Sequence, residues 1–181
     1  MSDVIDSLHQ DHINQTQLIG IADRALDELE AGASTDYALL EDVMRYMTGY
    51  PDLHHHPKED AVFKKLMERD PELRGKLDAM LKEHDSIIAA GRRFLGSIQA
   101  VEEDAMLSRV AFVAQGRAYL DALKQHMNIE ESQLFPAARE KLSASDWDEL
   151  EYQVEHQPDP LFGPSVDADC ERLWKLIQLH Q

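Results

Sequence analysis

Apolar residues recur every three or four positions along most of the chain, which is the period of an amphipathic helix, and no segment alternates like a strand. The first periodic segment begins at Ile5 and stops at Gly32. The second begins near Ser34 or Thr35, either of which could cap it, and continues to Pro51, where proline should kink or break the helix. The pattern therefore predicts two long helices before the first proline.

The same period continues beyond that proline. The helix is expected to resume with Pro57 in or near its first turn and to end at Pro71. A third long segment has its apolar face between Leu77 and Val101, and a fourth extends over residues 103–142. Long amphipathic helices joined by short loops favour an all-α, antiparallel up-down-up-down four-helix bundle made of residues 1–142.

Residues 143–181 differ from the bundle and are interpreted as a C-terminal helical extension. Ser145 could cap a short helix, the proline-rich run 157–164 cannot be helical, and residues 166–179 form a final amphipathic piece. This extension has no linker composition, so it is expected to pack on the bundle and not to form a separate domain. The apolar residues that need burial there are Trp147, Leu161, Phe162, Leu173 and Trp174.

Composition narrows the functional classes. The 181 residues include 18 Lys and Arg against 35 Asp and Glu, which gives a formal charge of −17 and disfavours nucleic acid and anionic membranes as partners. The first residues do not resemble a signal peptide, and no run of 18 apolar residues occurs. The single cysteine, Cys170, cannot form an internal disulfide. A cytoplasmic protein is expected.

Candidate chemistry lies in the histidines and glutamates. Two histidines occupy positions on the apolar faces of their helices, and two others are each followed four residues later by Glu, on the same face of a helix. The six residues are His12, His55, Glu59, His84, His126 and Glu130.

The spacing of these residues repeats. His12 precedes His55 by 43 residues and His84 precedes His126 by 42, so each half of the chain is a helical hairpin with a lone His and a His-x-x-x-Glu pair. Two such hairpins about a pseudo-twofold axis would bring four imidazoles and two carboxylates into one core. Buried carboxylates need compensating cations, and six ligands are too many for one tetrahedral zinc. Imidazole and carboxylate ligands without thiolates suit iron, manganese or zinc, and the pattern favours two metal ions.

Several other residues are secondary candidates. His9 could line the edge of the site, His56 could pair with Asp60 one turn later, and His156 could cover an open position. Among the adjacent histidines 54–56, the middle one is favoured because it stands four residues before Glu59. Tyr119 lies on the face of His126, either as a hydrogen-bond donor in the pocket or as a core tyrosine. His54 and His180 are assigned no role.

These motifs resemble the hemerythrin-like family, also called HHE cation-binding domains, over residues 3–140. The resemblance implies a four-helix bundle that holds a non-haem di-iron centre, typically oxo- or hydroxo-bridged, so two iron ions are expected in preference to manganese or zinc. Glu59 and Glu130 would bridge the irons, and the four histidines would complete the ligand set. The oxygen carriers of that family have a second His where Ile88 stands here. The motifs that carry the resemblance are Asp11-His12, residues 55–60, Glu83-His84 and residues 126–136.

Three functions are compatible with this pattern. The leading hypothesis is a non-haem di-iron protein that binds or reacts with a small oxidant, namely oxygen, peroxide or nitric oxide, at the six-residue site. The alternative is an iron-binding sensor or storage module without turnover. A metal-free helical interaction protein is the third. A protein partner or redox donor cannot be identified from the sequence.

Overall fold

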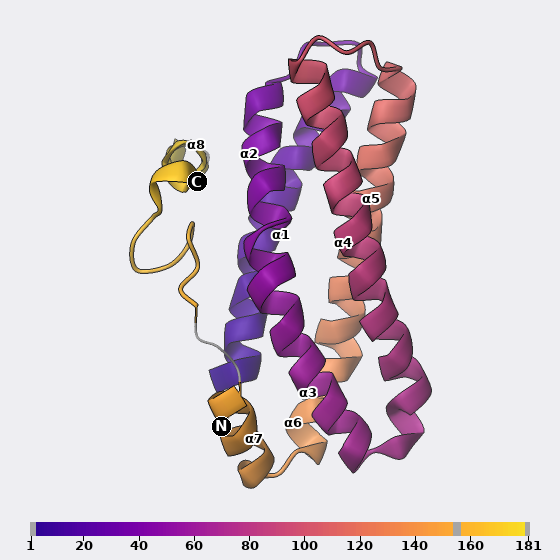
Figure 1. The fold of residues 1–181 in the computed structure, drawn as a ribbon, viewed down its shortest axis with the longest axis vertical. Helices are drawn as coiled ribbons and strands as arrows, with labels where there is room; N and C mark the ends of the chain where they lie inside the picture. Colours follow the sequence, from indigo (N-terminus) through magenta and orange to yellow (C-terminus); the bar gives the residue numbers. More distant parts are fainter. Residues whose placement is uncertain (1–2, 154–156, 180–181) are drawn as a thin grey trace.

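The computed structural model describes residues 3–153 and 157–179, and its regular elements within these ranges are all helices. Four helical columns run alternately up and down the long axis, with the C-terminal segment at one side (Figure 1). This confirms the predicted helical bundle. The elements are α1 (Asp3–Glu30), α2 (Tyr37–Met47), η1 (Pro51–His55), α3 (His56–Arg69), η2 (Pro71–Leu73), α4 (Arg74–Glu102), α5 (Arg109–Ile129), η3 (Glu130–Leu134), α6 (Phe135–Lys141), α7 (Ala144–Gln153), η4 (Ala168–Cys170) and α8 (Glu171–Leu179).

Two helix starts differ from the sequence expectation. The cap of α2 is Asp36, not Ser34 or Thr35, because the Asp36 carboxylate accepts a hydrogen bond from the backbone N–H of Leu39 at 2.9 Å. The fourth column begins at Arg109 and not near residue 103, since Ser108 is the N-cap of α5. The connection before it includes a left-handed residue, Asp104, with φ 64°.

Two wide π-type turns, η1 and η3, interrupt the second and fourth columns. Each ends two residues before a proline, Pro57 or Pro136. Proline lacks the N–H of a helical turn, and its ring clashes with the carbonyl four residues earlier. The preceding residue instead donates its N–H to the carbonyl five residues back. The widened turns therefore let both columns continue through the proline.

The bundle interior contains two hydrophobic clusters. The upper cluster includes Leu26, Phe94 and Leu120, and the lower cluster includes Leu8 and Phe63, all with side chains at most 1% exposed. Along α1 the lower cluster stops at Leu8 and the upper cluster begins at Leu18. Between them lies a polar layer that contains the candidate site.

The C-terminal extension contacts the bundle at two places. Helix α7 packs against α1 and α3, and α8 packs against α2. The start of α7 is capped by Ser143 and not by Ser145, since Ser143 Oγ accepts from the N–H of Asp146 while that carboxylate accepts from the N–H of Ser143. Of the five residues expected to be buried, Leu161 and Leu173 are buried, and Trp147, Phe162 and Trp174 are partly buried.

No helix within the described ranges is both long enough and apolar enough to cross a membrane.

Candidate metal centre

The structure brings all six predicted residues together in the polar layer of the bundle. None of these residues is more than 3% exposed. The histidines come from α1, η1, α4 and α5, and the glutamates come from α3 and the start of η3. The six are His12, His55, Glu59, His84, His126 and Glu130.

Glu59 lies between histidines of both halves of the chain. Its Oε1 is 3.3 Å from Nε2 of His12 and 3.2 Å from Nε2 of His55. Its Oε2 is 3.3 Å from Nε2 of His84. One carboxylate therefore faces imidazoles on two sides, as a bridging ligand must.

Glu130 has a similar position. Its Oε1 is 3.0 Å from Nε2 of His126 and 3.4 Å from Nε2 of His84. Its Oε2 is 3.5 Å from Nε2 of His12. Both carboxylates are therefore shared by the two halves of the chain.

A second set of carboxylates holds the other nitrogen of each ring, and it follows the pseudo-twofold relation of the sequence. The acid before each lone His contacts the His of the His-x-x-x-Glu pair in its own half. The acid after each Glu contacts the lone His of the opposite half. The Nδ1 to oxygen distances are 3.0 Å for His55 and Asp11, 3.2 Å for His126 and Glu83, 2.8 Å for His84 and Asp60, and 2.7 Å for His12 and Glu131.

His56 joins the site in a way that the sequence did not predict. It is 4% exposed, its ring stacks on that of His84 with centroids 4.6 Å apart, and it meets the ring of His126 edge-on at 6.2 Å. The expected pair with Asp60 is wrong, because Asp60 contacts His84, and the carboxylate near Nδ1 of His56 is that of Asp52, at 3.6 Å. His55 is the last residue of the π turn η1 and His56 is the first residue of α3, and both are buried.

The other secondary candidates lie at the edge or outside the site. Nδ1 of His9 is 3.0 Å from Glu131. His54 is half-buried with its ring against Tyr50. Tyr119 is a buried member of the upper hydrophobic cluster. His156 and His180 lie outside the described residues.

The electrostatics of the site couple imidazoles to carboxylates. Burial lowers the pKa of both His12 and His84. For His12, the interactions with Glu131 and the two central glutamates outweigh burial and raise the pKa to about 10. For His84, the interactions with Asp60 and the same two glutamates raise the pKa to about 11. Burial and the neighbouring cationic imidazoles hold the pKa of His56 well below its usual range. The lowered pKa favours the neutral form of the His56 ring.

The donor set fits metal ions. Both oxygens of Glu59, Oε2 of Glu130 and Nε2 of His126 are buried without a hydrogen-bond partner in the described part of the chain. Such orphaned groups are costly in a protein interior, and a cation would satisfy them. The ligand atoms of two groups lie within 4.8 Å of one another, and Glu59 belongs to both. The first group is His12, His55 and Glu59. The second group is His56, Glu59, His84 and His126.

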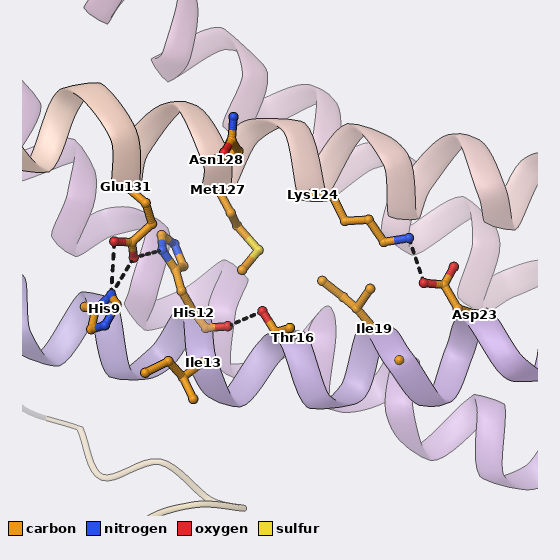
Figure 2. Close-up of a pocket in the computed structure, with 11 residues that line it drawn as sticks. His9, His12, Ile13, Thr16, Ile19, Asp23, Lys124, Met127, Asn128 and Glu131 are labelled. Carbon is orange, nitrogen blue, oxygen red and sulfur yellow. Dashed lines mark hydrogen bonds and ion pairs between the residues drawn. The ribbon is translucent and has the colours of Figure 1, made fainter.

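A groove of about 550 Å³ lies beside the site, between α1 and α5. Figure 2 shows Met127 reaching from α5 towards α1, and Glu131 between His9 and His12. At the other end, the Lys124 ammonium pairs with Asp23 at 2.6 Å. The groove brings solvent close to the His12 side of the site.

Comparison with known proteins gives one family. A family model described as hemerythrin HHE cation binding domain matches residues 3–138, a range that holds every residue of the site. No curated protein matches the chain.

Proposed function

Because the chain belongs to the hemerythrin HHE cation-binding domain family, we propose that it is a non-haem di-iron protein that binds or reacts with a small oxidant, namely oxygen, peroxide or nitric oxide. The buried cluster of histidines and glutamates supports this proposal, because its ligand atoms lie close enough together to hold metal ions. The ligands would be His12, His55, Glu59, His84, His126 and Glu130.

One observation carries the proposal. Glu59 and Glu130 are both fully buried, and imidazole nitrogens of both halves lie within 3.5 Å of each carboxylate. Two carboxylates in a low-dielectric interior need cationic compensation. Four imidazoles and two shared carboxylates match the helical-bundle arrangement for two metal ions, and the lack of thiolate suits iron.

When bound, such a centre would supply an open coordination position and one-electron redox chemistry. The protein's own residues hold the imidazole ligands in position. The carboxylates on Nδ1 fix the tautomer of each imidazole, so that Nε2 points into the site. The hydrophobic clusters at both ends exclude bulk water, and access is restricted to the sides of the polar layer.

The test is the metal content of untagged protein by mass spectrometry, with absorption spectra of the same sample in air, after reduction, and after addition of peroxide or nitric oxide. We expect two irons per chain and near-ultraviolet bands that bleach on reduction and change with the oxidant. Protein that carries two irons but shows no change with any oxidant would favour the sensor or storage alternative.

A pair of matched variants controls for folding. Replacing both bridging residues, Glu59→Gln with Glu130→Gln, should abolish iron binding. Glu140→Gln, at an exposed position on α6, should leave it unchanged. Unchanged iron in the double variant would overturn the assignment.

A further inference from the structure

Three aromatic rings in contact with one another begin next to the metal centre. His54 is joined by one peptide bond to His55, a residue of the centre. The His54 ring lies against that of Tyr50 with centroids 5.5 Å apart, and the Tyr50 ring stacks on that of Tyr46 at 6.1 Å. These separations are typical of packed aromatic pairs. Because tyrosine rings can lose one electron and packed rings exchange electrons readily, the two tyrosines form a possible electron path to the centre.

The carboxylate of Asp11 connects this pair of tyrosines to the centre. Its Oδ2 is 3.0 Å from Nδ1 of His55. Burial raises the pKa of Tyr46 and of Tyr50, and the charge of Asp11 adds to the rise in both. Charges act over short distances in salt solution. Both phenols therefore lie close to the carboxylate that orients a metal ligand.

Tyr46 has a proton acceptor in direct contact. Tyr46 is 5% exposed, and its hydroxyl donates a hydrogen bond to Oδ2 of Asp159 at 2.8 Å. Oδ1 of Asp159 accepts from the backbone N–H groups of Leu161 and Phe162 at 2.8 and 2.9 Å, which fixes the carboxylate. A phenol that loses an electron becomes a strong acid, and an uncompensated charge is costly in a protein interior. Asp159 can take the phenol proton, so that the oxidised Tyr46 is neutral.

A cavity of about 330 Å³ lies between α2 and the C-terminal extension, and both tyrosines line it. This volume is within the range of small-molecule sites. The formal charge of the protein is −17, and the cavity has three aspartates against one arginine, so an anion is disfavoured. The cavity therefore suits a small neutral molecule that contacts the phenol rings. The charged residues and the thiol that line it are Asp42, Arg45, Asp167, Asp169 and Cys170.

We propose that Tyr46 is a redox-active residue, and that Tyr46 and Tyr50 carry electrons to the metal centre from a neutral phenolic donor of the hydroquinone type bound in this cavity. This inference rests on the proposed function, because the centre must react with an oxidant. It adds the class of the reducing substrate and the residues through which its electrons pass.

The reaction balances with hydrogen peroxide as the oxidant. One hydroquinone loses two electrons and the protons of its two O–H groups and becomes a quinone. One hydrogen peroxide takes up two electrons and two protons, its O–O bond breaks, and two water molecules form. Each electron passes through Tyr46, whose O–H proton moves to Asp159 as the electron leaves and returns when the donor replaces that electron. The protons of hydroquinone go to solvent, which supplies those that peroxide takes up.

Electron paramagnetic resonance of the iron-loaded protein tests the role of Tyr46 without an activity measurement. Peroxide added in the absence of a donor should produce a tyrosyl radical, with hyperfine splitting that narrows when the tyrosines are ring-deuterated. Tyr46→Phe should remove this signal, because the hydroxyl of Tyr50 faces only the backbone carbonyl of Gln157, at 3.4 Å, which cannot take a proton. Tyr37→Phe, on the same helix but against Phe112, should retain it. No tyrosyl signal in the wild type, or an unchanged signal in Tyr46→Phe, would overturn the proposal.

Asp159→Asn tests the proton acceptor with the phenol left in place. The amide can still accept from the two backbone N–H groups but cannot take the phenol proton, so the tyrosyl signal should be lost. A signal of wild-type intensity in this variant would refute the role of Asp159. The variant also decides the question if Tyr46→Phe does not fold.

Calorimetric titration of the reduced, iron-loaded protein without oxidant measures binding of the donor. Hydroquinone should bind at one site in the wild type and in Cys170→Ser. It should not bind in Cys170→Trp, because the larger side chain fills the cavity. Ascorbate, a reductant that is an anion, should not bind to the wild type. Hydroquinone affinity in Cys170→Trp equal to that of the wild type, or equal affinities for ascorbate and hydroquinone, would overturn the assignment of the cavity.

The failure of this proposal and that of the proposed function are separable in the wild type. Protein that cannot be loaded with two irons, or whose absorption does not change with any oxidant, contradicts the proposed function and this inference with it. Protein with two irons whose absorption changes with peroxide, but which forms no tyrosyl radical, contradicts only the inference.

Discussion

Asp11 directly precedes His12 in the chain, yet its carboxylate contacts His55, 44 residues away, with Oδ2 3.0 Å from Nδ1 of that ring. The acid that contacts His12 is Glu131, from the other half of the chain. Each half of the chain therefore orients a histidine of the opposite half. The carboxylates that hold Nδ1 couple the assembly of the bundle to the orientation of the metal ligands.

This arrangement predicts the effect of Glu131→Gln. The amide retains the shape but not the charge that fixes His12, so iron affinity should fall by about 10- to 100-fold while the fold is retained. Competition with a chelator followed by metal analysis measures this. Glu140→Gln serves as the control. Equal iron retention in both variants would show that the contact between Glu131 and His12 does not tune the site.

The metal-free protein should lose stability as the pH rises. In the folded state the pKa of His12 is raised to about 10 and that of His84 to about 11, above the unfolded value of 6.5. The stabilisation is complete below pH 6.5 and is lost as the pH rises through these folded values. Thermal unfolding of the metal-free form should therefore occur at lower temperature at pH 9.5 than at pH 7.

The iron-loaded protein is the comparison for this pH effect. Metal in place of protons holds the same nitrogens, so its unfolding temperature should change less over the same range. Equal pH dependence of both forms would contradict the assignment of these imidazoles as ligands.

Gly116 allows close approach of helices in the upper hydrophobic cluster. A Cβ there would lie 2.7 Å from Cζ of Phe94 and 2.9 Å from a methyl group of Leu26. Gly116→Ala should therefore destabilise the protein by about 1 to 3 kcal/mol, as measured by denaturant unfolding. Gly96→Ala, in open space on α4, should be neutral or stabilising by up to about 1 kcal/mol. The opposite order would refute this account of the packing.

The C-terminal extension is predicted to stabilise the bundle without affecting the metal. Leu161 is fully buried, and Asp159 nearby accepts a hydrogen bond from the hydroxyl of Tyr46 at 2.8 Å. Leu161→Ala should lower the unfolding free energy by about 2 to 5 kcal/mol. Iron content per folded chain should stay at the wild-type value. Loss of iron at full folding would instead make the extension part of the site.

The sequence by itself determined the helical columns and the six central candidates. Apolar residues three and four positions apart indicate which face of a helix is buried. The repeat of a lone His with a His-x-x-x-Glu pair can be read from the sequence without coordinates. These are local properties, because residues four apart share a face in any regular helix. For the same reason His55 could be chosen over His54 by counting back from Glu59.

Only the tertiary structure decided which residues act on one another across the bundle. The crossed contacts of Asp11 and Glu131 depend on how four columns pack, and nothing in their own segments indicates the partner. The predicted pair of His56 with Asp60 is wrong because Asp60 contacts His84 of another helix, a contact that the sequence of α3 does not indicate. The groove at Met127 likewise lies between α1 and α5, which are far apart in sequence. The pattern of one helix fixes its buried face, but the contacts between helices follow from packing alone.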